Sequence, residues 1–198
     1  TGNVGSRGTG LHLFRGLANE QGALDAGCVP DWLPGHQRVA DDDARTRFEA
    51  AWGVELPAAP GPDANGLLGR FGSEIRGALV VGENPAVVKR DRAWVTERLD
   101  ALETLVCVDI APNETTPYAD VVLPAATLLE TDGTVTNLDR QIQRLRPLRS
   151  PPGSARPERT IVQELGKRLL GETVTFEYDS ARAVFAEMSR LTEIFGSY

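Results

Sequence analysis

Three short, largely apolar runs constrain the fold of this chain more than any other feature of its sequence. They span residues 78–81, 105–110 and 120–123. Runs this short are typical of strands that are buried on both faces of a sheet. Apolar residues recur at helical spacing in residues 91–102, between the first two runs. A strand, a helix and a second strand of these lengths indicate a right-handed crossover, which makes the two strands parallel.

We therefore predict an α/β fold, a Rossmann-like parallel sheet flanked by helices, with a glycine-rich irregular N-terminal segment. Residues 1–40 contain eight glycines, which leave no room for a long regular element. Capping residues and apolar spacing predict further helices over residues 41–52, 63–71, 158–170 and 179–191. We expect residues 1–62 to be a glycine-rich loop segment plus a helix, part of a neighbouring lobe. Residues 63–198 are predicted to form a dinucleotide-binding α/β domain.

The charge of the chain excludes one class of partner. A formal net charge of −7 and a pI near 4.9 argue against nonspecific nucleic-acid binding, which needs a basic surface. No run of about eighteen apolar residues occurs, so we predict no membrane span in this chain. The first residues lack the basic and apolar regions of a signal peptide, so a cytoplasmic location is expected.

Cysteine and histidine are too scarce for a metal site built by this chain. Cys28 and Cys107 are the only cysteines and form no Cys-x-x-Cys, so no iron–sulfur or zinc site of that type is expected. Cys107 lies within an apolar run and is predicted to be a small buried hydrophobe. His12 and His36 are isolated, as surface or hydrogen-bonded histidines commonly are. We predict no metal ligand among these residues.

Polar residues follow two of the predicted strands, where ligands bind in open α/β sheets. Gly82-Glu83-Asn84-Pro85 comes directly after the first strand. Gly82 removes a side chain where a phosphate can approach the backbone, and Asn84 offers hydrogen-bond donors and acceptors. Asp109 ends the second strand and can accept hydrogen bonds from ribose hydroxyls or a guanine edge. An ordinary βα turn and a solvated or helix-capping aspartate are the alternatives.

Arg15 lies in an otherwise nearly uncharged glycine-rich stretch. Because a guanidinium forms two parallel hydrogen bonds with carboxylate, nitrate or phosphate, Arg15 is a candidate anion ligand. Arg15-Gly16 and Asn19-x-Gln21-Gly22 can equally be loop chemistry only. Residues 132–134, Asp-Gly-Thr, can likewise be a simple turn.

Together these motifs resemble the molybdenum- or tungsten-dependent bis(molybdopterin guanine dinucleotide) oxidoreductases. The order and spacing of the matching segments hold along nearly the whole chain. The segments are Thr1–Gly5, Gly8–Gly10, Arg15-Gly16, Asn19, Gln21–Ala23, Asp31, Leu33–Gly35, Gly82–Pro85, Asp109-Ile110, Ala119–Pro124, Glu130, Asp132–Thr134, Asn137 and Gln143-Arg144.

Within that family, the motif around Arg15 is most similar to formate dehydrogenase large subunits. The resemblance implies that Arg15 is a catalytic residue, which lies by the metal and holds the carboxylate of a small anionic substrate. It also implies the reaction. Formate is oxidised to carbon dioxide at the metal, and an iron–sulfur cluster passes the electrons on.

The resemblance also implies which residues bind the cofactor, molybdopterin guanine dinucleotide with molybdenum or tungsten. Its contacts fall on Gly82, Glu83, Asn84, Asp109 and Glu158. The family's cysteine segments have no match here, so the iron–sulfur cluster is expected outside this chain. The expected partners are the remaining domains of the same subunit and an electron-transfer subunit or acceptor protein. The isolated chain is expected to be inactive.

Three departures from the formate dehydrogenase pattern leave other readings open. Leu17 and Val108 stand where that type usually has Gln, and Ala125 stands at a position that is often Ser. A nitrate reductase catalytic subunit is one alternative. The other is the large peripheral subunit of respiratory complex I, which keeps the fold without molybdenum. The retained Gly-Glu-Asn-Pro motif and Asp109 favour a working cofactor site.

Overall fold

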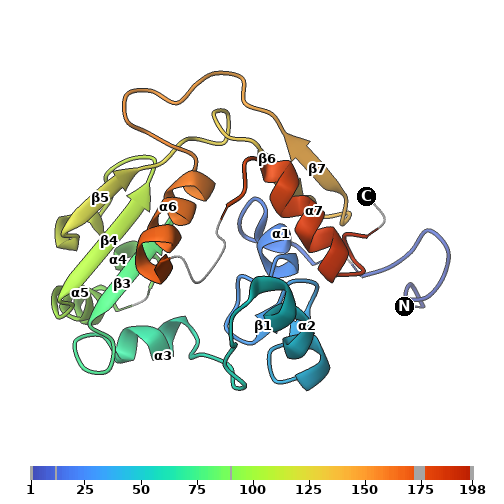
Figure 1. Cartoon of the computed structure of the whole chain (residues 1–198), viewed down its shortest axis with the longest axis horizontal. Helices are drawn as coiled ribbons and strands as arrows, with labels where there is room; N and C mark the ends of the chain where they lie inside the picture. The colour runs from blue at the N-terminus through green and yellow to red at the C-terminus, as the bar shows by residue number, and fades with distance from the viewer. Residues whose placement is uncertain (1, 12, 90, 172–176, 197–198) are drawn as a thin grey trace.

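The structure, a computed structural model, describes residues 2–11, 13–89, 91–171 and 177–196. Its centre is a parallel sheet of three strands, β3 (Gly77–Val81), β4 (Thr104–Asp109) and β5 (Val121–Pro124), in the order β3-β4-β5 (Figure 1). Both pairs of neighbours are parallel. The predicted α/β class and the three predicted strands are confirmed.

One face of the sheet carries the main core. It is covered by α3 (Ala64–Gly69), α4 (Pro85–Val88), α5 (Arg92–Asp100) and the short 3-10 helix η1 (Thr116–Tyr118). Val95 and Leu99 of α5 pack against Leu105 and Cys107 of β4, and all four are buried. Each such side chain contributes roughly 1.5–3 kcal/mol when it leaves water. Cys107 is buried as predicted, and burial raises the pKa of its thiol.

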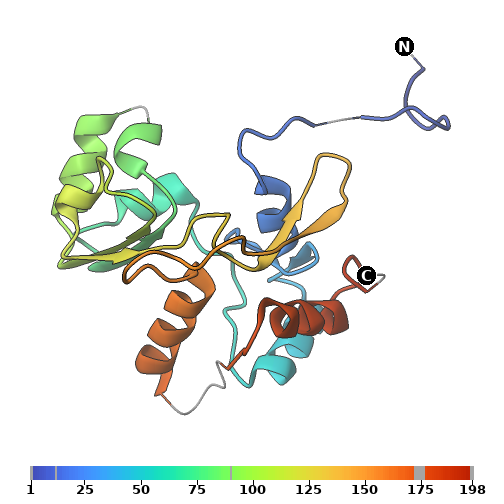
Figure 2. The same cartoon turned by 90° about the horizontal axis from the view of Figure 1, so that it is seen from above.

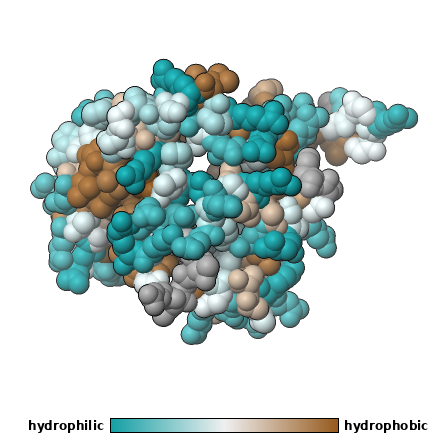
Figure 3. All heavy atoms as spheres, turned by 45° about the horizontal axis from the view of Figure 1, so that its top comes forward, coloured by the Kyte–Doolittle hydropathy of each residue, from teal (hydrophilic) through white to brown (hydrophobic). Residues whose placement is uncertain are grey.

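The opposite face is covered only in part, by α6 (Glu158–Leu170). Ile161 of α6 packs on Val108 and Ala125. The outer strand β3 stays open on this face, since Leu79 is 47% and Val81 38% exposed. Apolar side chains gather on the left of Figure 3, the side of the molecule that carries the sheet.

A second group of elements lies beside the sheet. It contains α1 (Glu20–Asp25), the hairpin β1 (Trp32–Leu33) and β2 (Gln37–Arg38), α2 (Asp42–Trp52), the hairpin β6 (Gly133–Thr136) and β7 (Ile142–Leu145), and α7 (Ala181–Leu191). The Gln37 amide donates to the Leu191 carbonyl, and the Trp52 indole N–H donates to Glu187 at 3.0 Å. Segments on both sides of residue 62 share this group. The domain division at that residue stays a prediction.

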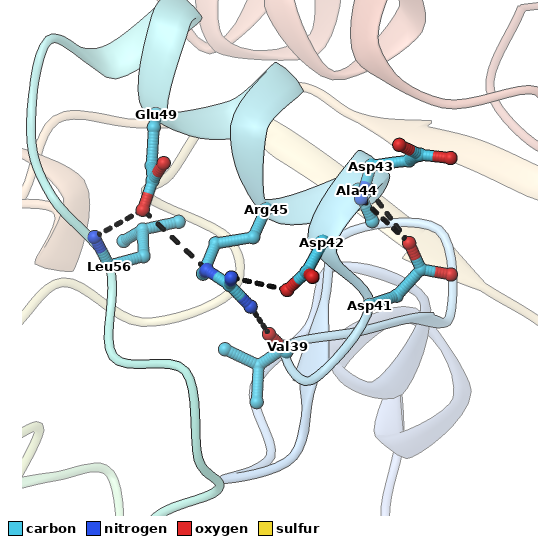
Figure 4. Close-up of polar contacts among 8 residues, drawn as sticks. All are labelled: Val39, Asp41, Asp42, Asp43, Ala44, Arg45, Glu49 and Leu56. Carbon is cyan, nitrogen blue, oxygen red and sulfur yellow. Dashed lines mark hydrogen bonds and ion pairs between the residues drawn. The ribbon is translucent and has the colours of Figure 1, made fainter.

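The start of α2 shows why a helix begins there (Figure 4). One carboxylate oxygen of Asp41 accepts the backbone N–H groups of Asp43 and Ala44, each at 3.0 Å. These are free donors at a helix N-terminus, so the Asp41 side chain caps them. Arg45 donates to the Val39 carbonyl and ties the helix to the preceding hairpin. The helix predicted over residues 41–52 is confirmed.

Several elements were not anticipated by sequence. The hairpins β1–β2 and β6–β7 and the short helix α1 lie in segments predicted to be irregular or turn-like. Gly133 and Thr134 belong to β6 and do not form the simple turn considered above. None of the helices in the described part of the chain is both long and apolar enough to cross a membrane.

Candidate functional site

The carboxyl edge of the sheet brings the strand-end motifs together. Gly82 follows β3 with φ +60°, and its N–H donates to the Val108 carbonyl at 2.8 Å, next to Asp109. A Cβ on Gly82 would meet nothing within 4 Å, so the backbone faces open space. Glycine is favoured here by the left-handed conformation, and the bare backbone is accessible to a ligand. Glu83 beside it is exposed.

Asn84 is held by the loop that follows β4. Its side-chain oxygen accepts from the Thr115 hydroxyl at 2.7 Å, and its amide nitrogen donates to Glu114 at 2.7 Å. Thr115 is fully buried, and its hydroxyl also accepts the Ala86 N–H. The hydrogen bond from Asn84 is the largest cause that lowers the pKa of Glu114 below its ordinary value. Glu114 therefore adds negative charge to this edge at neutral pH.

Asp109 closes the same loop from the other side. Its two carboxylate oxygens accept the Ile110 N–H at 2.6 Å and the Asn113 amide at 2.8 Å. The Asn113 oxygen in turn accepts the Thr115 N–H. Asp109 is thus an ordered carboxylate at the strand end, where ionised carboxylates accept up to about four hydrogen bonds. Capacity remains for a ligand donor.

Glu158 lies at the same edge because α6 begins there. Arg156 forms an isolated parallel bridge with Ala125, directly after β5, and α6 starts two residues later. The N-cap, Pro157, provides no side-chain hydrogen bond. The free N–H groups and the helix dipole therefore place partial positive charge beside the strand ends.

This set of groups fits a nucleotide-type cofactor tail. Open backbone at Gly82 and the start of α6 suit phosphate, and the carboxylates suit hydroxyl or guanine N–H donors. The five predicted cofactor residues, Gly82, Glu83, Asn84, Asp109 and Glu158, share one edge, and their roles stay predictions. Sequence reasoning missed Asn113, Glu114 and Thr115. Their signal is a polar triplet that follows β4 as Gly82–Pro85 follows β3.

A cavity of about 390 Å³ lies away from the sheet and contains Arg15. It is lined by Leu11, Leu13, Arg15, Gln21, Leu138, Asp139 and Arg140. Arg15 pairs loosely with Glu20 at 3.4 Å, and Glu20 also accepts the Gly16 N–H. The Nε of Arg15 is buried and has no hydrogen-bond partner within the described residues. A buried donor left unpaired is costly, so this atom is suited to a ligand that accepts.

Asn19 connects the Arg15 loop to the hairpin β6–β7, which lies beside α1 (Figure 2). Its side-chain oxygen accepts the Thr136 N–H of β6 at 2.8 Å, across 117 positions in sequence. Asn19 has a left-handed backbone, φ 64°. A Cβ on Gly22 would lie 2.0 Å from the same Asn19 oxygen, so only glycine fits there. Asn19 and Gly22 therefore have structural roles, which agrees with the alternative that these two positions serve the loop only.

Behind the cavity lies a buried polar cluster that sequence reasoning missed. Asp25 is 6% exposed and accepts from the Gln21 amide at 2.6 Å. His36 contacts the same Asp25 oxygen at 2.7 Å. His36 is therefore one of the hydrogen-bonded histidines expected above, while His12 lies outside the described residues. In the part of the chain that the structure describes, no group of His, Cys, Asp or Glu has the arrangement of a metal site.

Comparisons with known proteins agree with the motifs. The family described as molybdopterin oxidoreductase matches residues 1–168. "Putative formate dehydrogenase YrhE" of Bacillus subtilis is 40% identical over 196 residues, which cover 98% of this chain and 20% of that protein. "F420-dependent formate dehydrogenase subunit alpha" of Methanocaldococcus jannaschii is 38% identical over 192 residues, 97% of this chain and 28% of that protein.

A solved structure, acetylene hydratase from Pelobacter acetylenicus, is similar with a TM-score of 0.54 and 20% sequence identity. The match covers 73% of this chain and 21% of that chain, and it shows the fold alone. This chain thus spans about a fifth to just over a quarter of the length of the proteins that it matches.

Proposed function

The chain belongs to the molybdopterin oxidoreductase family, and we propose that it is the part of a formate dehydrogenase catalytic subunit that holds the cofactor tail and the substrate carboxylate. The observation that carries the proposal is the position of Arg15 in the cavity. It lines a cavity and has a buried, unpaired Nε within the described residues. Relatives named as formate dehydrogenases at 35–40% identity support the same substrate.

In the proposed reaction, this chain binds and orients the substrate. The Arg15 guanidinium donates to the carboxylate of formate and balances its charge. Leu11, Leu13 and Leu138 line the same cavity and give it apolar surface beside the guanidinium. The metal of the bound cofactor supplies the centre that accepts the two electrons of formate.

The proposed cofactor is molybdopterin guanine dinucleotide with molybdenum or tungsten. Asp109, Glu83 and Glu158 would accept from hydroxyl or guanine donors, while Gly82 leaves room for phosphate and the backbone N–H groups at the start of α6 are donors for it. The Asn84 side chain would hydrogen-bond the cofactor after its amide nitrogen releases the Glu114 carboxylate. The iron–sulfur cluster, the acceptor protein and the other domains belong to the proposal and lie outside this chain. The cytoplasmic location stays a prediction.

The complete subunit provides the test. With stoichiometric molybdenum or tungsten, it should reduce a redox dye when formate is added, while this chain alone should be inactive. Turnover with nitrate and none with formate would identify the nitrate reductase alternative, which Leu17 at the Gln position of the formate type favours. A complete subunit that binds neither metal nor pterin would instead fit the structural role in complex I.

A further inference from the structure

The amide of Gln21 is held in one orientation by a buried carboxylate. Gln21 and Asp25 lie one turn apart on α1, and both are less than a tenth exposed. The Gln21 nitrogen contacts an Asp25 oxygen at 2.6 Å. An ionised carboxylate only accepts hydrogen bonds, so the nitrogen and not the oxygen of the amide must face it. A flipped amide would set two acceptors against each other.

A second residue fixes that carboxylate. The Nε2 of His36 lies 2.7 Å from the same Asp25 oxygen and therefore carries the hydrogen. His36 has φ 59°, and Gly35 before it has φ +79°. Histidine adopts this left-handed conformation rarely, and such residues persist where the surroundings hold them. Trp32 packs edge-on against the imidazole at 4.6 Å and supplies one such contact.

Two donors of residues that line the cavity have no acceptor among the described residues. One is the buried Nε of Arg15, which has no partner within the described residues. The other is the second hydrogen of the Gln21 nitrogen, for which no acceptor lies among the described residues. Both residues line the same cavity of about 390 Å³. A small planar oxyanion has two acceptor oxygens and matches two such donors.

We propose that Gln21 is a specificity-determining residue that donates to the oxyanion held by Arg15, with Asp25 and His36 as positioning residues. The identity of the oxyanion as formate rests on the proposed function, whereas the donor role of Gln21 does not. Gln21 selects against ligands that present a donor at this point, because its oxygen cannot take the place of its nitrogen.

Isosteric variants of the complete subunit, loaded with cofactor, test the inference. Gln21→Glu replaces the donor with a negative charge and should raise the KM for formate at least about tenfold, with kcat changed less than about threefold. Asp25→Asn frees the amide to flip, and His36→Phe keeps a ring against Trp32 without the N–H. Each should raise the KM in the same direction by about three- to tenfold.

The control is Gln141→Glu, an exposed residue next to Arg140 that adds the same charge at the rim of the cavity. Its KM should stay within about twofold of the wild type, since a rim charge is screened by solvent. A KM for Gln21→Glu within that same range overturns the inference. So do Asp25→Asn and His36→Phe variants that lose folding stability without any change in KM.

A second readout needs no turnover. Formate or nitrate should raise the melting temperature of the cofactor-free complete subunit, because an anion that binds only the folded state stabilises it. The rise should disappear in Gln21→Glu and persist in Gln141→Glu. A rise that Gln21→Glu retains, or none in the wild type, contradicts the inference. If the wild type does not oxidise formate, the proposed function fails, and this anion response alone decides the role of Gln21.

Discussion

The edge of the sheet and the Arg15 cavity are built from segments at very different distances along the chain. At the edge, Asn84 and Thr115 are 31 positions apart, and a single strand–helix–strand unit supplies both. At the cavity, Asn19 and Thr136 are 117 positions apart, and the lining comes from the first and the third quarter of the chain. The strand-end loops are therefore a local product of the crossover, whereas the cavity depends on the Arg15 segment and the β6–β7 hairpin, which meet only in the folded state.

Mutations in the two regions should have different effects in the complete subunit, one on turnover and the other on cofactor content. Arg15→Ala should lower kcat/KM with formate by about 10²–10³-fold, because it removes the charged donor that pairs with the substrate carboxylate. Molybdenum content should not change, since the proposed cofactor tail lies at the sheet edge. Arg15→Lys keeps the positive charge and should lower kcat/KM with formate less than Arg15→Ala does. Metal analysis and steady-state kinetics measure the two effects. Loss of metal in Arg15→Ala would show that cofactor binding depends on Arg15 and would contradict a separate substrate role.

Gly22→Ala tests the long-range side of the comparison. The added Cβ would lie 2.0 Å from the Asn19 oxygen, so Asn19 must move and release the Thr136 N–H. Overpacking and the lost hydrogen bond should together cost about 2–4 kcal/mol of unfolding free energy. Denaturant unfolding of the 198-residue chain measures this. Gly69→Ala, where a Cβ meets nothing within 4 Å in a helix, should be neutral or slightly stabilising.

Asp109→Ala gives the reverse pattern to Arg15→Ala. The variant removes a charged acceptor from the proposed cofactor contacts and should weaken cofactor retention by about 10–100-fold. Turnover per bound molybdenum should stay near the wild-type value. Metal content after dialysis against chelator, beside kinetics normalised to metal, provides the measurement. A normal metal content would remove Asp109 from the cofactor site.

Thr115→Val tests the local network by itself. The Thr115 hydroxyl is buried, donates to Asn84 and accepts the Ala86 N–H, so an isosteric methyl leaves both partners unpaired. The expected loss is about 1–3 kcal/mol of unfolding free energy. Thr96→Val on the exposed face of α5 is the matched control and should change stability by less than about 0.5 kcal/mol. Equal losses in the two variants would show that the buried network adds nothing.

The smallest effect concerns Tyr178, whose hydroxyl donates to Glu187 of α7. Burial, followed by the hydrogen bond to Glu187, raises the pKa of Tyr178 to about 12. The unfolded chain ionises this phenol near pH 10, so Tyr178 contributes fully below pH 10, and its contribution is lost as the pH rises to about 12. Tyr178→Phe should flatten that decline, and Tyr118→Phe should not. Unfolding free energies measured at intervals between these pH values distinguish the two variants.

The sequence predicts the sheet side well because its signals are local. The apolar runs, the helix over residues 91–102 and the strand-end polar residues all lie within one continuous stretch. The three strands and the helix were confirmed as elements. Asp109 was equally well placed, at the end of β4. The roles of Gly82, Glu83, Asn84, Asp109 and Glu158 stay predictions.

The cavity side could not be read in the same way. Arg15 stood out because of its charge, but nothing near it in sequence indicates the Thr136 N–H or the Arg140 side chain. Asp25 and His36 are eleven positions apart, and a short hairpin with two left-handed residues brings them together. Two-residue strands of this kind have no apolar alternation to detect.

The contacts of α7 have a consequence for the order in which the chain folds during synthesis. Gln37 is made 154 residues before Leu191, whose carbonyl it binds, and Trp52 is made 135 residues before Glu187. At about 5–20 residues per second, the ribosome needs roughly 7–30 seconds to add the missing partner. The β3–β5 sheet requires no such delay, since its strands follow one another closely. The hydrogen bond of Trp52 with α7 therefore forms only after α7 has been synthesised.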